Sequence, residues 1–230
     1  MTRTRAEGFP PMMIGDLEQG HRVNLPQWVR IYRVVLGALA LYAVYHNRFV
    51  QTYDEHFYQL FTNQSNVIAG IILILGGTLF ARRHPPLWWD YVRGAGVMIM
   101  VTTGAVYALL LGGLYNPFGD AHPLMDSVLH QLIPVVMVLD LLIVPLSPRV
   151  SWWGLLFFSI YPLLYLGYSI ANGARTDWYP YNFLNPGING GVAGVAITVC
   201  LLMIGFLLLS ALVISFSRRA SRPADQEPGP

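Results

Sequence analysis

The chain has 230 residues, of which 54% are hydrophobic and only 11% are charged, and its mean hydropathy is +0.47. Soluble domains carry roughly 25% charged residues, so this composition excludes a water-soluble domain and predicts an all-α integral membrane protein. The small formal net charge of +2 gives no sign of a nucleic-acid partner. All 14 basic residues are arginine, which excludes a Schiff-base lysine. The single cysteine, Cys200, excludes an internal disulfide and a multi-cysteine metal site.

Six apolar runs are long enough to cross a hydrocarbon core of ~30 Å, which requires about 20 helical residues. We predict one transmembrane domain over residues 28–216, with polar and proline- or glycine-containing breaks between its helices. The six predicted spans cover residues 28–46, 57–80, 90–114, 125–146, 152–171 and 188–216. Residues 1–27 are expected to form a cytoplasmic N-terminal arm. Residues 217–230 are rich in proline and charge and are expected to form a disordered C-terminal tail.

The distribution of arginine predicts the orientation, because cytoplasmic loops of membrane proteins carry an excess of positive residues. With the N-terminus inside, 11 arginines fall on the cytoplasmic side. Only Arg48 and Arg175 fall outside, and Arg33 lies within the first span. Both termini are therefore predicted to face the cytoplasm.

Five consecutive polar residues stand near the start of the second predicted span: Thr62, Asn63, Gln64, Ser65 and Asn66. Successive helical residues are about 100° apart, so this run leaves no face of its turn without a polar group. Such a turn is costly in lipid unless its side chains find partners inside the bundle. The hydroxyls of Thr62 and Ser65 are candidate nucleophiles. The alternative is that these side chains only join neighbouring helices by hydrogen bonds.

His130 is the candidate base, because it lies in the fourth predicted span at the same expected depth as Thr62, about five residues from the outer end. Asp126 precedes it by four residues and so shares its helical face. From there the carboxylate could orient one nitrogen of the imidazole ring. The alternatives are a histidine that bridges helices and an aspartate that is a surface charge.

Two further charged residues lie at matching depths on the cytoplasmic side, Arg33 in the first span and Asp140 in the fourth. A buried charge requires a partner, so we predict a structural ion pair between them, with Arg30 as the substitute for Arg33. Four histidines fall on the outer side, which raises a zinc site as an alternative. Their spacing shows no HxxxH or HxxE pair, and neither a metal nor another cofactor is expected. The four are His46, His56, His122 and His130.

The loop at residues 178–186 is interrupted by prolines and cannot be a regular helix. Its aromatic residues suit the membrane interface, where they could act only as an anchor. The functional interpretation is a lid over the outer mouth of the bundle, with apolar walls for a lipid tail and side-chain donors for a carbonyl. The expected pocket or lid residues are Gln64, Trp178, Tyr179, Tyr181 and Asn185.

Three ordered motifs resemble a known family. They are residues 61–66, residues 130–134 with Asp140, and the pair 161–162 followed by 178–186. Together they resemble the bacterial six-transmembrane relatives of the androgen-induced membrane hydrolases, the family that includes the androgen-dependent regulator of tissue factor pathway inhibitor. The resemblance covers roughly residues 30–216 and implies location in the bacterial inner (plasma) membrane.

The animal enzymes of that family are threonine hydrolases that cleave fatty acid esters of hydroxy fatty acids. By resemblance, Thr62 is the expected nucleophile and His130 the expected base. The animal motif continues with more apolar residues after its threonine, whereas polar residues follow here, and Ser65 is therefore the alternative nucleophile.

The resulting hypothesis is an intramembrane hydrolase for lipid-like fatty-acyl esters, with membrane lipids around it. Asn63, Asn66 or loop amides would hold the oxyanion. The alternatives are a non-enzymatic carrier or receptor for a small polar-headed ligand in the same pocket, and a zinc-dependent membrane hydrolase.

Overall fold

The computed structural model describes residues 24–50, 56–82, 84–111 and 124–220, and within these ranges its regular elements are helical. The five long segments Gln27–Phe49 (α1), Leu87–Leu110 (α3), Leu124–Ile143, Gly154–Thr176 (α6) and Gly191–Arg219 are each long and apolar enough to cross a membrane. Phe61–Gly77 (α2) is a shorter apolar helix. This inventory confirms a helical protein of membrane type. Residues 1–23 of the expected N-terminal arm and most of the C-terminal tail lie outside the described residues.

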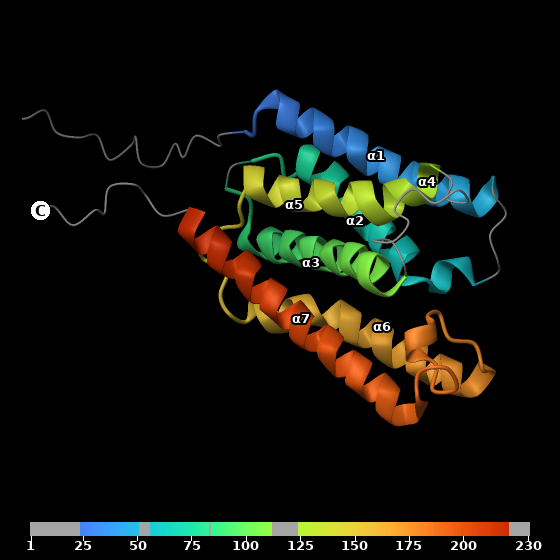
Figure 1. Ribbon diagram of the computed structural model, residues 1–230. Coiled ribbons are helices and arrows are strands. Elements are labelled where there is room, and N and C mark those ends of the chain that lie inside the picture. Colours follow the sequence, from blue (N-terminus) through green and yellow to red (C-terminus); the bar gives the residue numbers. More distant parts are fainter. Residues whose placement is uncertain (1–23, 51–55, 83, 112–123, 221–230) are drawn as a thin grey trace, which may run out of the picture.

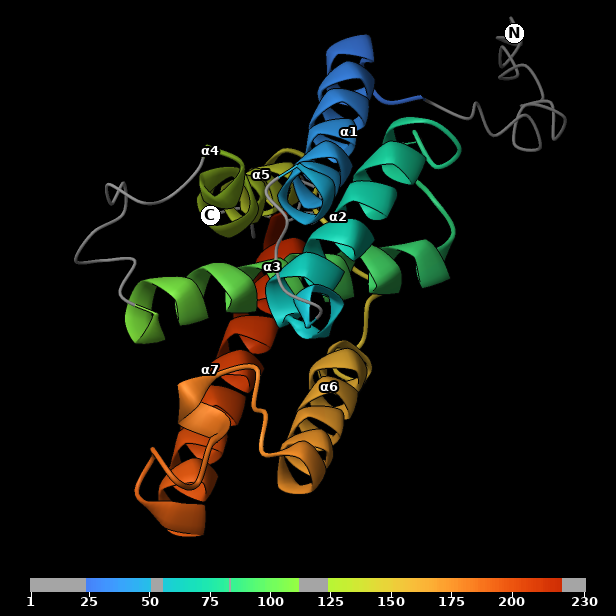
Figure 2. The same cartoon turned by 90° about the vertical axis from the view of Figure 1, so that its right-hand side faces the viewer.

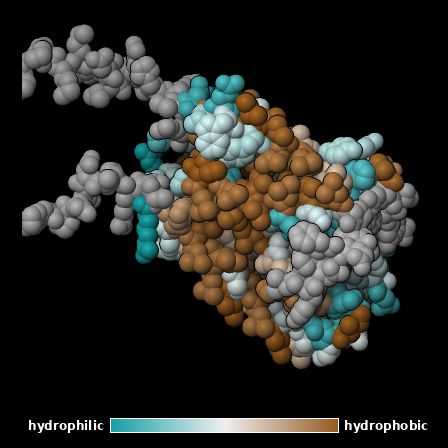
Figure 3. All heavy atoms as spheres, turned by 45° about the horizontal axis from the view of Figure 1, so that its top comes forward, coloured by the Kyte–Doolittle hydropathy of each residue, from teal (hydrophilic) through white to brown (hydrophobic). Residues whose placement is uncertain are grey.

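Helix α3 lies between two groups of helices (Figures 1 and 2). On one side it contacts α2 and α5 (Ile133–Ile143), and α1 packs on α2 beyond them. On the other side it contacts α6 and α7 (Gly191–Ala220). The start of α1 and the end of α7 lie at the same end of the bundle (Figure 1). Figure 3 shows a broad apolar band on one face, with hydrophilic residues gathered towards its ends.

Glycine permits the closest helix contact, between α1 and α2. A Cβ atom added to Gly37 would lie 2.7 Å from the backbone oxygen of Gly70, and one added to Gly77 would lie 2.7 Å from that of Arg30. These distances leave no room for any side chain. Small residues at such positions let membrane helices approach backbone to backbone.

The second apolar segment begins later than expected. Residues Phe57–Gln59 form a separate 3₁₀ turn (η2), Leu60 is extended, and α2 starts at Phe61. Thr62 therefore lies in the first turn of α2 and not five residues inside a helix that starts at residue 57. The first turn of a helix has free N–H groups, and polar side chains placed there can fold back onto the preceding backbone.

The fourth apolar segment is not a uniform α-helix. It consists of α4 (Leu124–Ser127), a π-helical turn (η3, Val128–Leu132) and α5. Pro134 has no N–H to donate to the carbonyl of His130, and its ring crowds that carbonyl. Next to this proline, the N–H of Ile133 bonds to the oxygen of Val128, five residues back, and not to the residue four back as in an α-helix. Proline thus accounts for the wider turn, which holds His130.

The last helix continues past its expected end at residue 216 and reaches Ala220. Arg218 explains the extension, because its Nε atom donates to the backbone oxygen of Val150 at 3.2 Å. Its guanidinium also lies over the ring of Trp152, 5.1 Å from the centroid. The tail predicted from residue 217 is therefore helical in its first four residues.

Candidate functional site

A cavity of about 90 Å³ lies between α2, α3, α6 and α7, beside the segment that connects α6 to α7. Its walls are mostly aliphatic and aromatic, and include Val106 of α3, Pro162 and Leu166 of α6, and Leu202 and Phe206 of α7. Figure 2 shows α6 and α7 separating towards the end where residues 177–190 connect them. The volume accommodates several water-sized groups, and the lining suits an apolar chain better than water.

Hydroxyl groups gather where the cavity meets the start of α2. The backbone N–H of Phe61, the first residue of α2, donates to the hydroxyls of both Tyr165 and Tyr181, each at 3.1 Å. The Tyr181 hydroxyl also hydrogen-bonds the side chain of Thr62. The Tyr165 hydroxyl donates its own hydrogen to the oxygen of Gln59 at 2.9 Å. Thr62 and Tyr181 are thus two hydrogen-bonded hydroxyls that line the cavity side by side at this end.

Tyr181 belongs to the connection between α6 and α7, and its hydroxyl end points inward onto α2. Burial raises the pKa of the Tyr181 phenol above its ordinary value of 10.0, and hydrogen bonds from Thr62 and Phe61 only partly oppose this shift. The phenol is therefore neutral near pH 7. It can donate or accept a hydrogen bond, but it cannot serve there as a strong base.

The polar run at residues 62–66 finds its partners in several directions. Asn63 and Gln64 donate their side-chain N–H groups to the carbonyls of Phe57 and Tyr58, both at 2.7 Å, and so fold back onto η2. Gln64 also accepts a hydrogen bond of 2.7 Å from the hydroxyl of Tyr161. These contacts explain how a polar turn is tolerated among apolar helices.

Ser65, the alternative nucleophile, is fully buried against α3. Its hydroxyl lies 2.9 Å from the Thr103 hydroxyl and donates to the backbone oxygen of Thr62, also at 2.9 Å. Ser65 is not among the residues that line the cavity, whereas Thr62 is. The cavity therefore favours Thr62 over Ser65 as the hydroxyl that meets a ligand.

His130 lies on the π-helical turn and is oriented by Asp126. Its Nδ1 atom is 3.0 Å from the backbone oxygen of Asp126 and 3.3 Å from the carboxylate Oδ1 of the same residue. Both of these atoms are acceptors when the carboxylate is ionised, which favours the tautomer of the neutral ring that has its hydrogen on Nδ1 and its lone pair on Nε2. The ring also stacks on Tyr107, with centroids 4.5 Å apart.

Within the described part of the chain, no hydrogen bond joins Thr62 to His130, and His130 does not line the cavity. The two segments are linked indirectly by Asn66. Its Nδ2 atom donates to the backbone oxygens of Thr62 at 2.8 Å and of Leu129 at 3.0 Å. The Oδ1 atom of Asn66 is buried and has no hydrogen-bond partner among the described residues. The described residues that line the cavity include no charged or imidazole side chain, so none of them is a base for Thr62.

The expected lid residues Trp178, Tyr179 and Asn185 hold the connection between α6 and α7 in place and do not line the cavity. Trp178 stacks on His56, with centroids 4.1 Å apart. Tyr179 packs on α6 at Gly173, where an added Cβ atom would lie 2.2 Å from its ring. The Asn185 side chain accepts the N–H of Gly187 at 2.8 Å. Tyr181 is the expected lid residue of this segment that lines the cavity, and its neighbours Phe183 and Leu184 line it as well.

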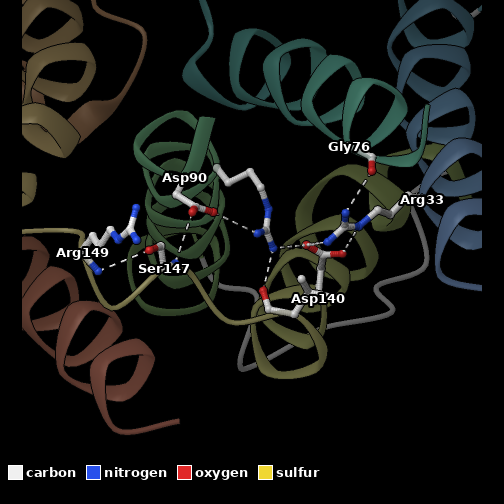
Figure 4. Close-up of polar contacts among 8 residues, drawn as sticks. Arg33, Gly76, Asp90, Asp140, Ser147 and Arg149 are labelled. Carbon is white, nitrogen blue, oxygen red and sulfur yellow. Dashed lines mark hydrogen bonds and ion pairs between the residues drawn. The ribbon is translucent and has the colours of Figure 1, made fainter. Parts of the chain in front are cut away.

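At the opposite end of the bundle, Asp140 is the centre of a buried charge network (Figure 4). Its carboxylate pairs with Arg33 at 2.5 and 3.0 Å, so the ion pair predicted between these residues is present. It also accepts hydrogen bonds from Tyr32 at 2.6 Å and from Arg93 at 3.0 Å. Arg33 in turn donates to the backbone oxygen of Gly76 at 3.0 Å.

Sequence reasoning missed Tyr32 and two charged members of this network, Arg93 and Asp90. Arg93, counted among the cytoplasmic arginines, is only 4% exposed, and Asp90 is 1% exposed. They lie one helical turn apart on α3, and their side chains approach to 3.4 Å. The spacing of three residues between opposite charges, in an otherwise apolar segment, is the signal that could have identified them.

The described residues contain no group of three His, Cys, Asp or Glu side chains placed to hold a metal ion. The outer-side residue His122 lies outside the described ranges. Comparisons with protein-family models, with curated proteins and with solved structures find no match to this chain.

Proposed function

We propose that this protein binds a lipid-like molecule, with an apolar chain in the cavity between α3, α6 and α7 and a polar group at Thr62 and Tyr181. The observation that carries the proposal is the composition of this cavity. Its walls are apolar, and the hydroxyls of Thr62 and Tyr181 are placed together at the end beside α2. Such a combination suits a ligand with one apolar tail and one carbonyl or hydroxyl group.

The proposed setting is the plasma membrane, with six spans and both termini in the cytoplasm. The start of α1 and the end of α7 at one end of the bundle support an even number of crossings. The excess of arginine at that end supports its cytoplasmic location. The cavity then lies in the outer half of the membrane, where a ligand can enter sideways from the lipid.

Binding is tested with purified protein in detergent and tritiated palmitate or palmitoyl methyl ester as the probe. Leu202→Trp fills the cavity and should abolish saturable binding. Leu201→Trp is its matched control, because Leu201 is 65% exposed on the same helix and does not line the cavity. Equal binding by the two variants would disprove the proposed site.

The polar end is tested separately with Thr62→Val, which keeps the shape of the side chain and removes the hydroxyl. We expect weaker binding by roughly fivefold to tenfold, since a hydrogen bond contributes about 1 kcal/mol. Thr78→Val is the control, because Thr78 is exposed at the far end of α2. An unchanged affinity for Thr62→Val would remove Thr62 from the site.

A second candidate function is hydrolysis of a fatty-acyl ester by Thr62, with His130 as the base. The observation that favours it is the orientation of the imidazole: Asp126 holds the hydrogen on Nδ1, which leaves Nε2 able to accept a proton. The resemblance to the threonine hydrolases points to the same pair. His130 would have to approach Thr62 for this reaction; its place on a π-helical turn supports a functional role, since such turns are frequent at functional sites.

Hydrolysis is tested with a fluorophosphonate probe and with a chromogenic palmitoyl ester. Labelling and turnover that are lost in both Thr62→Ala and His130→Ala, and kept in Ser65→Ala, would support catalysis. General-base assistance typically contributes 10²–10⁴-fold, so His130→Ala should lower kcat by about that factor. Saturable palmitate binding without labelling or turnover would support the binding function and contradict hydrolysis.

A further inference from the structure

A second cavity of about 710 Å³ lies at the end of the bundle where α1 and α3 begin and α5 ends. It is bounded by residues 25–29, 84–90 and 143–149. Unlike the cavity beside α2, this one is lined by charged as well as apolar side chains. Asp90 lines its interior, and His84 and Arg149 are exposed around it.

Asp90 is a buried carboxylate with few hydrogen bonds. Its Oδ2 atom accepts the backbone N–H of Ser147 at 3.2 Å, and its Oδ1 atom is 3.4 Å from Arg93. Asp140, by comparison, accepts four hydrogen bonds from arginine and tyrosine side chains. An ionised carboxylate has about four lone-pair directions, so Asp90 retains acceptor capacity. Because Asp90 lines the cavity, that capacity is available to a ligand with N–H donors.

Arg149 supplies the opposite charge. Its guanidinium has no carboxylate within ion-pair distance among the described residues, and Figure 4 shows Arg149 and Asp90 on either side of Ser147. Arginine binds phosphate oxygens well because its planar donors match their geometry. The same cavity thus contains a carboxylate, Asp90, that can bind a cation and an arginine, Arg149, that can bind an anion.

The position of this cavity matches the depth of lipid headgroups. Exposed tryptophans mark the same end of the bundle, at Trp28, Trp88, Trp152 and Trp153. Tryptophan is enriched where a membrane meets water. Leu25, Leu87 and Ile143 add apolar lining that would contact the glycerol and upper acyl groups.

We propose that this cavity is a binding site for a phosphoethanolamine headgroup, with the primary ammonium on Asp90 and the phosphate on Arg149. A choline headgroup fits less well, because its quaternary ammonium has no N–H to donate to the carboxylate. A glycerol headgroup lacks the cation altogether. The site is separate from the cavity beside α2 and does not depend on the function proposed for that cavity.

The test is native mass spectrometry of the full chain in detergent, titrated with dioleoyl phosphatidylethanolamine, phosphatidylcholine or phosphatidylglycerol. We expect the ethanolamine lipid to bind about tenfold more tightly than the choline lipid, the ratio that one charge-assisted hydrogen bond supports. Asp90→Asn should remove this preference, and Arg149→Gln should weaken binding of the ethanolamine lipid. Leu87→Trp, which obstructs the cavity, should abolish the preference for the ethanolamine lipid.

Two controls keep the result interpretable. Asp177→Asn removes an exposed carboxylate at the other end of the bundle, and Leu79→Trp adds a tryptophan at a position that is 66% exposed and outside the cavity. Both should bind like the wild type. If the melting temperature shows that Asp90→Asn is unfolded, Arg149→Gln and Leu87→Trp decide the outcome. Equal affinity for the three lipids, or an unchanged preference in those variants, would overturn the proposal.

Soluble O-phosphoethanolamine distinguishes the source of the headgroup. Weak competition that needs a large excess over the lipid supports a membrane lipid as the ligand. Binding of the soluble compound as tight as that of the lipid supports a free phosphoethanolamine ligand at the same residues. Failure of the soluble compound to compete at any concentration would contradict headgroup recognition.

Discussion

Asn66 on α2 and Leu129 on the π-helical turn are joined by a hydrogen bond of 3.0 Å from the asparagine side chain to the backbone oxygen. The same amide group donates to the carbonyl of Thr62. One buried side chain therefore couples the helix that carries Thr62 to the turn that carries His130. This link connects the segments of the two candidate catalytic residues, Thr62 and His130.

Asn66→Ala is expected to destabilise the protein by about 1–3 kcal/mol, because it leaves two buried carbonyls without this donor. The effect should appear as a lower melting temperature of the purified protein in detergent. Asn182→Ala is the control, since Asn182 is exposed in the connection between α6 and α7. Equal melting temperatures for Asn66→Ala and the wild type would show that the link contributes nothing.

Asp140→Asn is expected to be the most damaging single change in the charge network. Asp140 faces two arginines, and its loss leaves Arg33 and Arg93 with Asp90 as the one remaining carboxylate of the network among the described residues. Breaking a buried ion pair costs about 3–5 kcal/mol. Denaturant unfolding in detergent would measure the change, and Asp177→Asn, at an exposed carboxylate, should leave stability within about 0.5 kcal/mol of the wild type.

Gly37→Ala is expected to force α1 and α2 apart, because the added Cβ atom would meet the Gly70 oxygen at 2.7 Å. Overpacking of this kind costs about 1–3 kcal/mol. Gly167→Ala is the matched control, since nothing lies within 4 Å of its added Cβ atom. In the interior of α6 that change should be neutral or stabilising, by up to about 1 kcal/mol. Similar melting temperatures for the two variants would refute the close packing.

Tyr181 should make the stability of the protein sensitive to alkaline pH. The pKa of Tyr181 is raised in the folded state above its ordinary value of 10.0. The phenol therefore contributes fully to the free energy of unfolding below pH 10, and this contribution is lost as the pH rises through the pKa of the folded state. Tyr181→Phe should therefore weaken the fall in melting temperature above about pH 10. Tyr58→Phe, at a tyrosine that is 51% exposed, should keep the fall seen in the wild type. Parallel curves for wild type and Tyr181→Phe would contradict the assignment.

The helical membrane class could be predicted from the sequence because it depends on composition and on the length of apolar runs. Charge content, mean hydropathy and the spacing of loop residues locate the helices to within a few residues of their observed bounds. The pair between Arg33 and Asp140 could also be predicted, since two isolated charges at matching depths in lipid have few other partners.

Only the tertiary structure decided how the polar groups are distributed. Hydrophobicity does not reveal that α2 begins at Phe61, because that boundary depends on Asn63 and Gln64 folding back onto η2. The π-helical turn follows from Pro134 and its packing near Gly104, and it sets the direction of the His130 ring. The partner of Thr62 is Tyr181, more than a hundred residues later in the chain. Sequence spacing within one helix carries no information about such a contact, because it depends on how α2, α6 and their connection pack.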